Sequence, residues 1–237
     1  MEWLGHLHKS LPLLDKEIIS CAKCPRLVEW REEVAVTKRK SYENEKYWGK
    51  PVPGFGPKNA GLVVIGLAPG AHGANRTGRV FTGDSSGDWL YKSLHKNGLA
   101  KIPTSVGAKD GQELFNTRIL CTVRCAPPDN KPSTDEKESC HPFFHNEIKL
   151  LMPTAKSFLA LGSVAWNTTY ATLLELGEVL PKPRKPFAHG VTVNFLGKDG
   201  IKRRLIASYH PSQQNTFTGK LTEKMLDTVI AKAKINL

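Results

Sequence analysis

The sequence lacks any hydrophobic run long enough to cross a membrane. Its most apolar stretch, residues 61–68, is far shorter than the ~20 residues that a spanning helix needs. Residues 1–9 contain no basic region followed by an apolar run, so we expect no signal peptide. Repeats, low-complexity tracts and a clear linker are also missing from the sequence. We therefore expect a cytoplasmic monomer with no membrane partner, folded as a single domain over residues 1–237.

Acidic residues are scarce relative to basic ones. Lys and Arg together number 34 against 22 Asp and Glu, which gives a net charge of +12. Such an excess favours a polyanionic partner through counterion release and electrostatic steering. It is also compatible with a lysine-rich solvated surface of the kind found in heat-adapted proteins. Charge alone therefore leaves a nucleic-acid partner and a merely solvated surface equally open.

Short β-branched runs alternate with helical patterns along most of the chain. Strands are predicted over residues 61–67, 117–124, 156–161, 191–196 and 204–208. Helices are predicted over residues 11–40 with a break at 21–25, and over 85–97, 136–151, 163–176 and 221–233. This alternation predicts a three-layer α/β/α sandwich with a central, mostly parallel sheet. Ligands of such folds bind at the carboxyl ends of the strands, where the loops beginning at Ala68, Cys125, Gly162 and Tyr209 would lie.

Five cysteines need an explanation, because a cytosolic protein keeps its thiols reduced. Cys21 and Cys24 form a C-x2-C pair at a helix start, Cys125 follows a predicted strand, and Cys140 opens the next helix. Four thiolates suit zinc or a 4Fe-4S cluster, and reduced structural thiols are the third interpretation. Cys121 is expected to be buried inside its strand, facing the same side as Cys125.

A glycine-rich loop, residues 66–84, follows the first predicted strand. Its glycines allow backbone N–H groups to approach a ligand closely. Phe81 is an aromatic residue in this polar loop, where it would either stack on a flat ring or pin the loop to the core. Asp84 precedes a helix and suits an N-cap. A carboxylate held by a helix N-terminus can also orient a water molecule, so the two roles are compatible.

Two further loops carry candidate residues. Asn130, in residues 125–132, is either a rigidly held amide or a simple turn residue. His210 stands at a strand end before a proline that keeps it extended, which makes it a better catalytic candidate than an isolated histidine. The residues after it carry side-chain donors suited to phosphates. These donors are Ser212, Gln213, Gln214, Asn215, Thr216, Thr218 and Lys220.

The motifs together resemble a known family. The loop 66–84, GLAPGAHGANRTGRVFTGD, resembles the first motif of the family 5 (type b) uracil-DNA glycosylases, iron–sulfur enzymes of the thermophile type. Residues 47–56, YWGKPVPGFG, are similar to the loop that precedes it there. Residues 123–132, VRCAPPDNKP, and 210–220, HPSQQNTFTGK, are similar to the second and third motifs. The resemblance extends over residues 21–221, nearly the whole chain.

This resemblance implies an activity and a set of partners. The activity is flipping of uracil out of DNA and hydrolysis of its N-glycosidic bond in base-excision repair. The substrate would be single- or double-stranded DNA that contains uracil or another deaminated base, and a sliding clamp is a possible partner. The family also implies a 4Fe-4S cluster, whose ligands by motif position would be Cys21, Cys24, Cys125 and Cys140.

The resemblance also implies roles for particular residues. Asp84 matches the residue that positions the attacking water, and His210 matches the donor to the departing base. Phe81 matches the ring stacked on that base, and Asn130 a polar residue near the water or base. The backbone at Gly66, Leu67 and Ala68 would surround the base. The third motif would supply DNA contacts from Ser212, Gln214, Asn215 and Lys220.

One departure bears on substrate choice. Cys121 stands where family 4 has the asparagine that reads the uracil edge, so uracil selectivity is expected to be weaker and hypoxanthine to be excised as well. Gly70 stands where family 5 commonly has alanine. The alternative to an enzyme is a noncatalytic iron–sulfur or zinc nucleic-acid-binding protein, and an electron-transfer protein is a third interpretation. Neither explains the Gly-rich loop, Asp84 and His210 on one rim.

Overall fold

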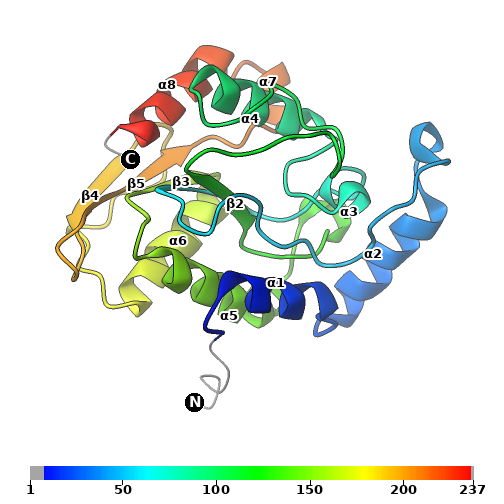
Figure 1. Ribbon diagram of the computed structural model, residues 1–237, viewed down its shortest axis with the longest axis horizontal. Coiled ribbons are helices and arrows are strands. Elements are labelled where there is room, and N and C mark those ends of the chain that lie inside the picture. Colours follow the sequence, from blue (N-terminus) through cyan, green and yellow to red (C-terminus); the bar gives the residue numbers. More distant parts are fainter. Residues whose placement is uncertain (1–7, 236–237) are drawn as a thin grey trace.

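The computed structural model describes residues 8–235, so the expected absence of a signal peptide concerns a segment that lies mostly outside the described residues. A five-stranded sheet forms the centre (Figure 1). Across the sheet the order is β2 (Thr117–Cys121), β1 (Leu62–Gly66), β3 (Ser157–Leu161), β5 (Lys202–Ser208) and β4 (Thr192–Leu196). All neighbouring strands are parallel except β4 and β5. The sheet is thus mostly parallel, as predicted.

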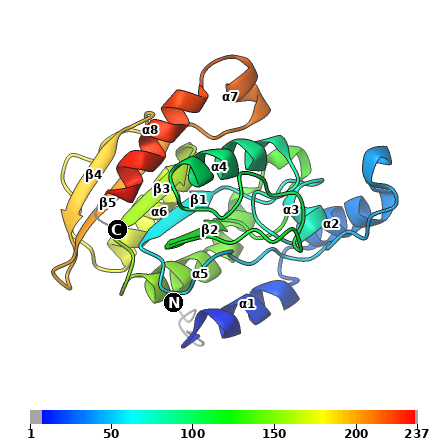
Figure 2. The same ribbon diagram turned by 45° about the horizontal axis from the view of Figure 1, so that its top comes forward.

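Helices cover both faces of this sheet, and β1 shows how the sequence directs them (Figures 1 and 2). Val63 and Ile65 pack into one core, and Leu62 and Val64 into the other, because successive strand side chains point to opposite faces. The first core lies against α1 (Leu11–Ser20), α2 (Pro25–Thr37), α5 (Thr134–Leu151) and α6 (Ser163–Glu175). The second lies against α4 (Ser85–Lys96) and α8 (Glu223–Lys234). The predicted three-layer α/β/α arrangement is confirmed.

Helix starts follow their local sequence signals. Pro25 occupies the first turn of α2, where its missing N–H costs nothing. Asp84 is the N-cap of α4, and its side chain accepts a hydrogen bond from the Gly87 N–H at 2.9 Å. Ser133 and Glu136 form a capping box at the start of α5. Two short helices, α3 (Ala74–Thr77) and α7 (Gln213–Phe217), lie in segments that were expected to be loops.

Three expectations about the cysteines are corrected. Strand β2 ends at Cys121 rather than at residue 124, so Cys121 is its last residue and not an interior one. Cys121 is buried as expected, but it packs in the core that contains Phe81, whereas Cys125 packs in the opposite core. The two-residue alternation stops where the strand stops, so it does not relate these two side chains. Cys140 lies inside α5 rather than at its start, because the capping box begins that helix earlier.

A buried charge network joins the helical layer to the sheet. Glu147 of α5 is fully buried and accepts from Arg118 Nε at 2.7 Å and from Arg124 Nη2 at 2.6 Å. Arg118 also lies 3.2 Å from Asp15 of α1. These charges are acceptable in the interior because each has an opposite partner. In the part of the chain that the structure describes, no helix is both long and apolar enough to cross a membrane.

Candidate active site

Phe81 and His210 meet at the carboxyl rim of the sheet. Their ring centroids are 5.6 Å apart and the planes are inclined by 32°. Phe81 is buried and has a positive φ of 50°, an uncommon conformation for an aromatic residue. Its ring lies directly over Gly66, where an added Cβ would be 2.7 Å from Phe81 Cε2. The end of β1 therefore needs a glycine so that the Phe81 ring can form a wall of the site.

The two oxygens of Asp84 have different surroundings. Oδ1 accepts the capping bond from Gly87, while Oδ2 faces the turn formed by residues 70–73. A Cβ on Gly70 would lie 3.0 Å from Oδ2, and one on Gly73 would overlap it. Burial raises the pKa of Asp84 above its ordinary value, and the N–H groups of Gly87 and Ser86 oppose that shift. The loop therefore wraps closely around one carboxylate oxygen.

Arg76 joins two parts of the loop that precedes Asp84. Its Nε donates to the His72 carbonyl at 2.8 Å, and its Nη2 donates to the Gly83 carbonyl at 3.0 Å. The Tyr42 ring covers the guanidinium, with its centroid 3.8 Å from Arg76 Cζ. Sequence reasoning did not single out Arg76, although it lies within the first motif. Because it fixes the residues that precede and surround Asp84, it sets where the carboxylate can sit.

His210 enters the site from the loop after β5. Its side chain is half-buried, and burial lowers its pKa to about 4. The imidazole is therefore neutral near pH 7 and offers one N–H donor rather than a full positive charge. Asn215 donates its side-chain amide to the His210 carbonyl at 2.9 Å. Asn215 thus holds the His210 loop in place, and this donor is already used within the protein.

The remaining third-motif residues lie around α7. Ser212 is the N-cap of α7, Gln214 and Lys220 are exposed, and the Lys220 Nζ lies 5.0 Å from the Tyr209 ring centroid. Phe217 ends α7 with 80% of its surface exposed. An aromatic side chain this exposed is not part of a core. The rim beside His210 therefore presents polar side chains and one free apolar ring.

Asn130 lies apart from these residues. It is exposed, has a φ of 57°, and ends the 3-10 turn at Pro128–Asn130. The next carbonyl, that of Lys131, accepts from Arg26 of α2. Among residues 8–235, no hydrogen bond or ring contact links Asn130 to Asp84, Phe81 or His210. Its catalytic role stays a prediction.

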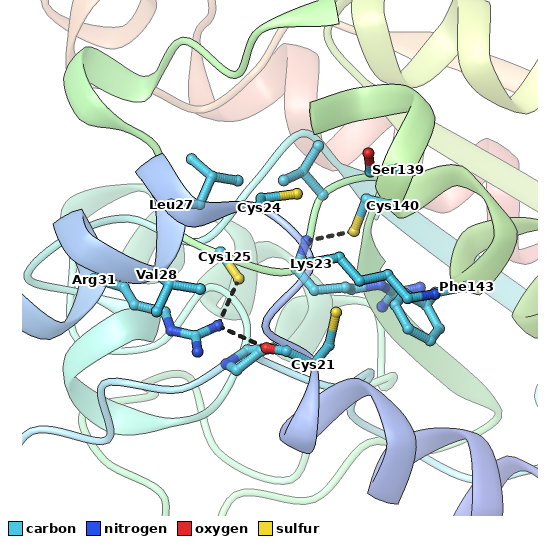
Figure 3. A pocket seen from close by; sticks show the side chains of 13 residues that line it. Cys21, Lys23, Cys24, Leu27, Val28, Arg31, Cys125, Ser139, Cys140 and Phe143 are labelled. Atoms are coloured by element: carbon cyan, nitrogen blue, oxygen red, sulfur yellow. Dashed lines mark hydrogen bonds between the residues drawn. The ribbon is translucent and has the colours of Figure 1, made fainter. Parts of the chain in front are cut away.

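Cys21, Cys24, Cys125 and Cys140 line one pocket, called here the thiol pocket (Figure 3). Its space is about 340 Å³, including solvent at its mouth. All four are free thiols, and burial raises the pKa of Cys125 to about 11 and that of Cys140 to about 12. The backbone N–H of Arg124 donates to Cys140 Sγ at 3.3 Å. The structure thus brings together all four residues that the sequence predicted as ligands.

Two buried arginines also line the thiol pocket. Arg31, 5% exposed, donates from Nη1 to Cys125 Sγ at 3.1 Å, and Arg124 is 1% exposed (Figure 3). The Arg31 Nε and the Arg124 Nε and Nη1 are buried without a hydrogen-bond partner. Such unsatisfied donors are rare in protein interiors. In the described part of the chain, no three ligand side chains are placed to hold a single metal ion. Four thiols beside buried guanidinium donors are a set of side chains that fits a thiolate-bound metal group.

Comparison with known proteins identifies the family. Residues 53–234 match the family model described as the uracil DNA glycosylase superfamily. The chain belongs to this superfamily. It is 47% identical to a protein of Mycobacterium leprae named type-5 uracil-DNA glycosylase, over 95% of each chain. A Thermus thermophilus protein with the same name is 45% identical over 92% of this chain and 94% of its own.

These relatives bear on two expectations. The resemblance to the type-5 branch is confirmed, because a Pyrobaculum aerophilum protein named type-4 uracil-DNA glycosylase is only 26% identical, over 85% of this chain. The predicted glycosylase fold is confirmed by the superfamily match together with the five-stranded, mostly parallel sheet. The alternative of a noncatalytic binding protein is not favoured.

Proposed function

We propose that this superfamily member hydrolyses the bond between uracil and its deoxyribose in DNA, as a monomeric base-excision repair enzyme of the cytoplasm. The observation that carries the proposal is the contact of the Phe81 and His210 rings at the rim of the sheet, beside a loop whose turn at residues 70–73 packs against the Asp84 carboxylate. A flat ring can stack on a base, a neutral imidazole can donate a hydrogen bond to the departing anion, and a carboxylate can orient a water molecule. Relatives that share almost half of their residues carry the same enzyme name.

The bond to be cleaved lies inside a stacked duplex, so the nucleotide has to leave the stack first. The net charge of +12 draws the protein to the phosphate backbone. Gln214 and Lys220 are exposed beside His210 and contact phosphates in this proposal. Phe217, exposed on the same segment, enters the space that the flipped nucleotide leaves.

Chemistry follows from the polarity of the breaking bond. Negative charge develops on the base and positive charge on the sugar. His210 donates a hydrogen bond to the base, together with N–H groups at Leu67 and Ala68, while Phe81 stacks on it. The Asp84 carboxylate orients a water whose oxygen bonds to the sugar carbon, and it offsets the positive charge there. The water passes its proton to the Asp84 carboxylate as the C–O bond forms, and the base leaves as an anion with the electron pair of the broken C–N bond.

We also propose that Cys21, Cys24, Cys125 and Cys140 hold a 4Fe-4S cluster. The thiol pocket supports this, because all four sulfurs line it and the buried Arg31 guanidinium donates to one of them, Cys125 Sγ, at 3.1 Å. When bound, the cluster supplies cross-links among α2, α5 and the loop after β2. Zinc, held by the same thiolates, is the second candidate, and metal analysis of the purified protein separates the two.

Substrate range extends beyond uracil in this proposal. Cys121 Sγ and the Phe81 ring both approach Gly66, and Sγ is 3.4 Å from where a Cβ on Gly66 would be. A buried thiol here offers no amide to read the edge of the base. We therefore expect hypoxanthine to be released as well as uracil. A single-turnover assay on an inosine-containing duplex that yields no product would overturn this extension.

The test of the main proposal is base release from a duplex with one uracil, followed by alkaline cleavage of the abasic site. Wild-type protein should cut the strand at that position. The Asp84→Asn variant should lose about 10²–10³ in single-turnover rate and still bind the duplex. Asparagine caps helices as well as aspartate, so α4 stays intact. No release by metal-loaded wild-type protein would reject the glycosylase, and an unchanged rate in the variant would remove Asp84 from the mechanism.

A further inference from the structure

Arg31 stands between the thiol pocket and the glycine-rich loop. Its guanidinium donates from Nη1 to Cys125 Sγ at 3.1 Å and to the Cys21 carbonyl at 3.2 Å (Figure 3). Its own backbone carbonyl faces the other way and accepts from the Asn75 side-chain Nδ2 at 3.1 Å. One residue therefore touches two proposed ligand residues with its side chain and the loop with its backbone.

Asn75 is fully buried in α3, in the middle of the loop. Its backbone N–H donates to the Gly70 carbonyl at 3.0 Å, and its carbonyl accepts from the Gly49 N–H at 3.0 Å. Its side-chain oxygen has no partner, so its only side-chain hydrogen bond is the one to Arg31 within the described residues. The buried amide is thus committed to α2 rather than to its own loop.

The contacts continue from Asn75 to Asp84 without a gap. The next residue, Arg76, bonds the His72 and Gly83 carbonyls, and Gly83 is followed directly by Asp84. Gly70, which accepts from Asn75, belongs to the turn that wraps Asp84 Oδ2. The links in this series are peptide bonds, hydrogen bonds and close packing contacts between buried or half-buried groups. A shift of Arg31 therefore displaces the residues that surround Asp84.

We propose that Arg31 and Asn75 join the thiol pocket to the glycine-rich loop, so that filling the pocket fixes the position of Asp84. The inference rests on the proposed function, because it assumes that the four cysteines bind a metal group as thiolates. A metal group bound by Cys21 and Cys125 would fix the two atoms that accept from Arg31 Nη1, the Cys125 sulfur at 3.1 Å and the Cys21 carbonyl at 3.2 Å. Without the metal group, Arg31 keeps its ion pair with Glu32 at 3.5 Å, but neither of its acceptors is fixed, so α2 is held less firmly against the loop. Arg31 and Asn75 are positioning residues here.

The experiment measures hydrogen–deuterium exchange in peptides covering residues 70–84. Four samples are compared: metal-loaded wild type, wild type depleted with a chelator, and metal-loaded Asn75→Leu and Thr169→Val. Leucine has nearly the shape of asparagine but cannot donate to Arg31. Thr169→Val is the matched control, since it also removes one buried side-chain hydrogen bond, from Thr169 Oγ1 to the Ala165 carbonyl in α6. Peptides from β3 and α8 provide the internal reference.

Loaded Asn75→Leu should keep the wild-type metal content and yet exchange faster in residues 70–84 than the wild type and the control. Removal of the metal should speed exchange in the same peptides of the wild type. In Asn75→Leu it should increase the exchange rate only slightly further. Single-turnover base release by loaded Asn75→Leu should fall about tenfold or more, because the Asp84 carboxylate is displaced.

Three results would overturn the coupling. They are unchanged protection of residues 70–84 on depletion, equal loosening of the whole chain, and purified wild type that holds no metal. Exchange requires no catalysis, so this test remains valid if the wild type proves unable to release uracil. An inability of the wild type to release uracil would reject the proposed function but would not reject the coupling.

Discussion

The Asp84 carboxylate fills the space in which a side chain on Gly73 would begin. The two residues belong to the same loop, and the turn at residues 70–73 is folded directly against Oδ2. A methyl group on Gly73 has to push either this turn or the carboxylate away. Since Oδ1 is held by the N-terminus of α4, the displacement falls on the side that faces the turn.

Gly73→Ala should therefore slow uracil release. A displacement of about 1 Å at a catalytic group costs about 100-fold in rate. The matched control is Gly107→Ala, because a Cβ at Gly107 meets no atom within 4 Å. Single-turnover rates of the two variants and the wild type are compared at equal metal content. If Gly73→Ala matches the control, the close packing around Oδ2 has no catalytic importance.

The rate of base release should fall on the acid side because of Asp84 and not because of His210. Asp84 acts as a carboxylate, and burial raises its pKa, so activity begins to fall at a higher pH than an exposed aspartate would allow. His210 has a pKa lowered to about 4, so it is already neutral across the physiological range and adds no step there. A pH profile of single-turnover rates for the wild type and His210→Gln tests this. The variant should be slower at every pH, but its rate should fall on the acid side at the same pH as the wild type. If the fall occurs at a different pH in the variant, His210 and not Asp84 causes it.

Phe217→Ala should affect duplex and single-stranded substrates differently. Phe217 is 80% exposed, so its removal leaves the thermal stability unchanged. A side chain that fills the gap in a stack matters only where a stack exists, so release from duplex should slow about tenfold and release from single strands much less. Val36→Ala is the control, because Val36 is 81% exposed on α2. Equal slowing on both substrates would argue that Phe217 does not fill the gap left by the flipped nucleotide.

Glu147→Gln should destabilise the fold. Glu147 compensates Arg118 and Arg124 in the interior, and these attractions hold its pKa below the ordinary value despite burial. Removing the negative charge leaves two buried cations and costs about 3–5 kcal/mol of unfolding free energy. Glu175→Gln removes a charge from an exposed pair with His141 and should cost about 1 kcal/mol or less. Denaturant unfolding of both variants measures the difference, and equal midpoints would show that the network contributes no stability.

The layers of this fold could be predicted from the sequence, because most of its helices and strands are marked by residues that lie close together in the chain. The buried run of β1 and the Asp84 cap of α4 are visible in a few neighbouring residues. The antiparallel direction of β4 could also have been predicted from the sequence. Only a short hairpin separates it from β5, and a parallel pair would need a long crossover. The short helices α3 and α7 escaped prediction because helices of four or five residues have no periodicity to detect.

The site was harder to predict where it depends on contacts between distant segments. Arg31 lies in a helix among other charged residues, and nothing nearby distinguishes it from a solvated surface arginine. Only the fold brings it against Cys125, 94 positions later in the sequence. Arg124 at least adjoins Cys125, which could have marked it as a neighbour of the ligands. Cys21 and Cys24 were noticed as a C-x2-C pair and Cys125 and Cys140 from their places beside a strand and a helix, and the family resemblance then implied all four as ligands.

The two tasks of Asp84 differ in how much chemistry they demand. Capping α4 requires only an oxygen that accepts from Gly87, and an amide satisfies it as well as a carboxylate does. Orienting a nucleophilic water requires the negative charge. A single-nucleotide change in the Asp84 codon can therefore produce a protein that folds, keeps its affinity for damaged DNA and releases the base about 10²–10³ times more slowly. Such a protein would occupy the damaged site for as long as the wild type does and leave the base in place.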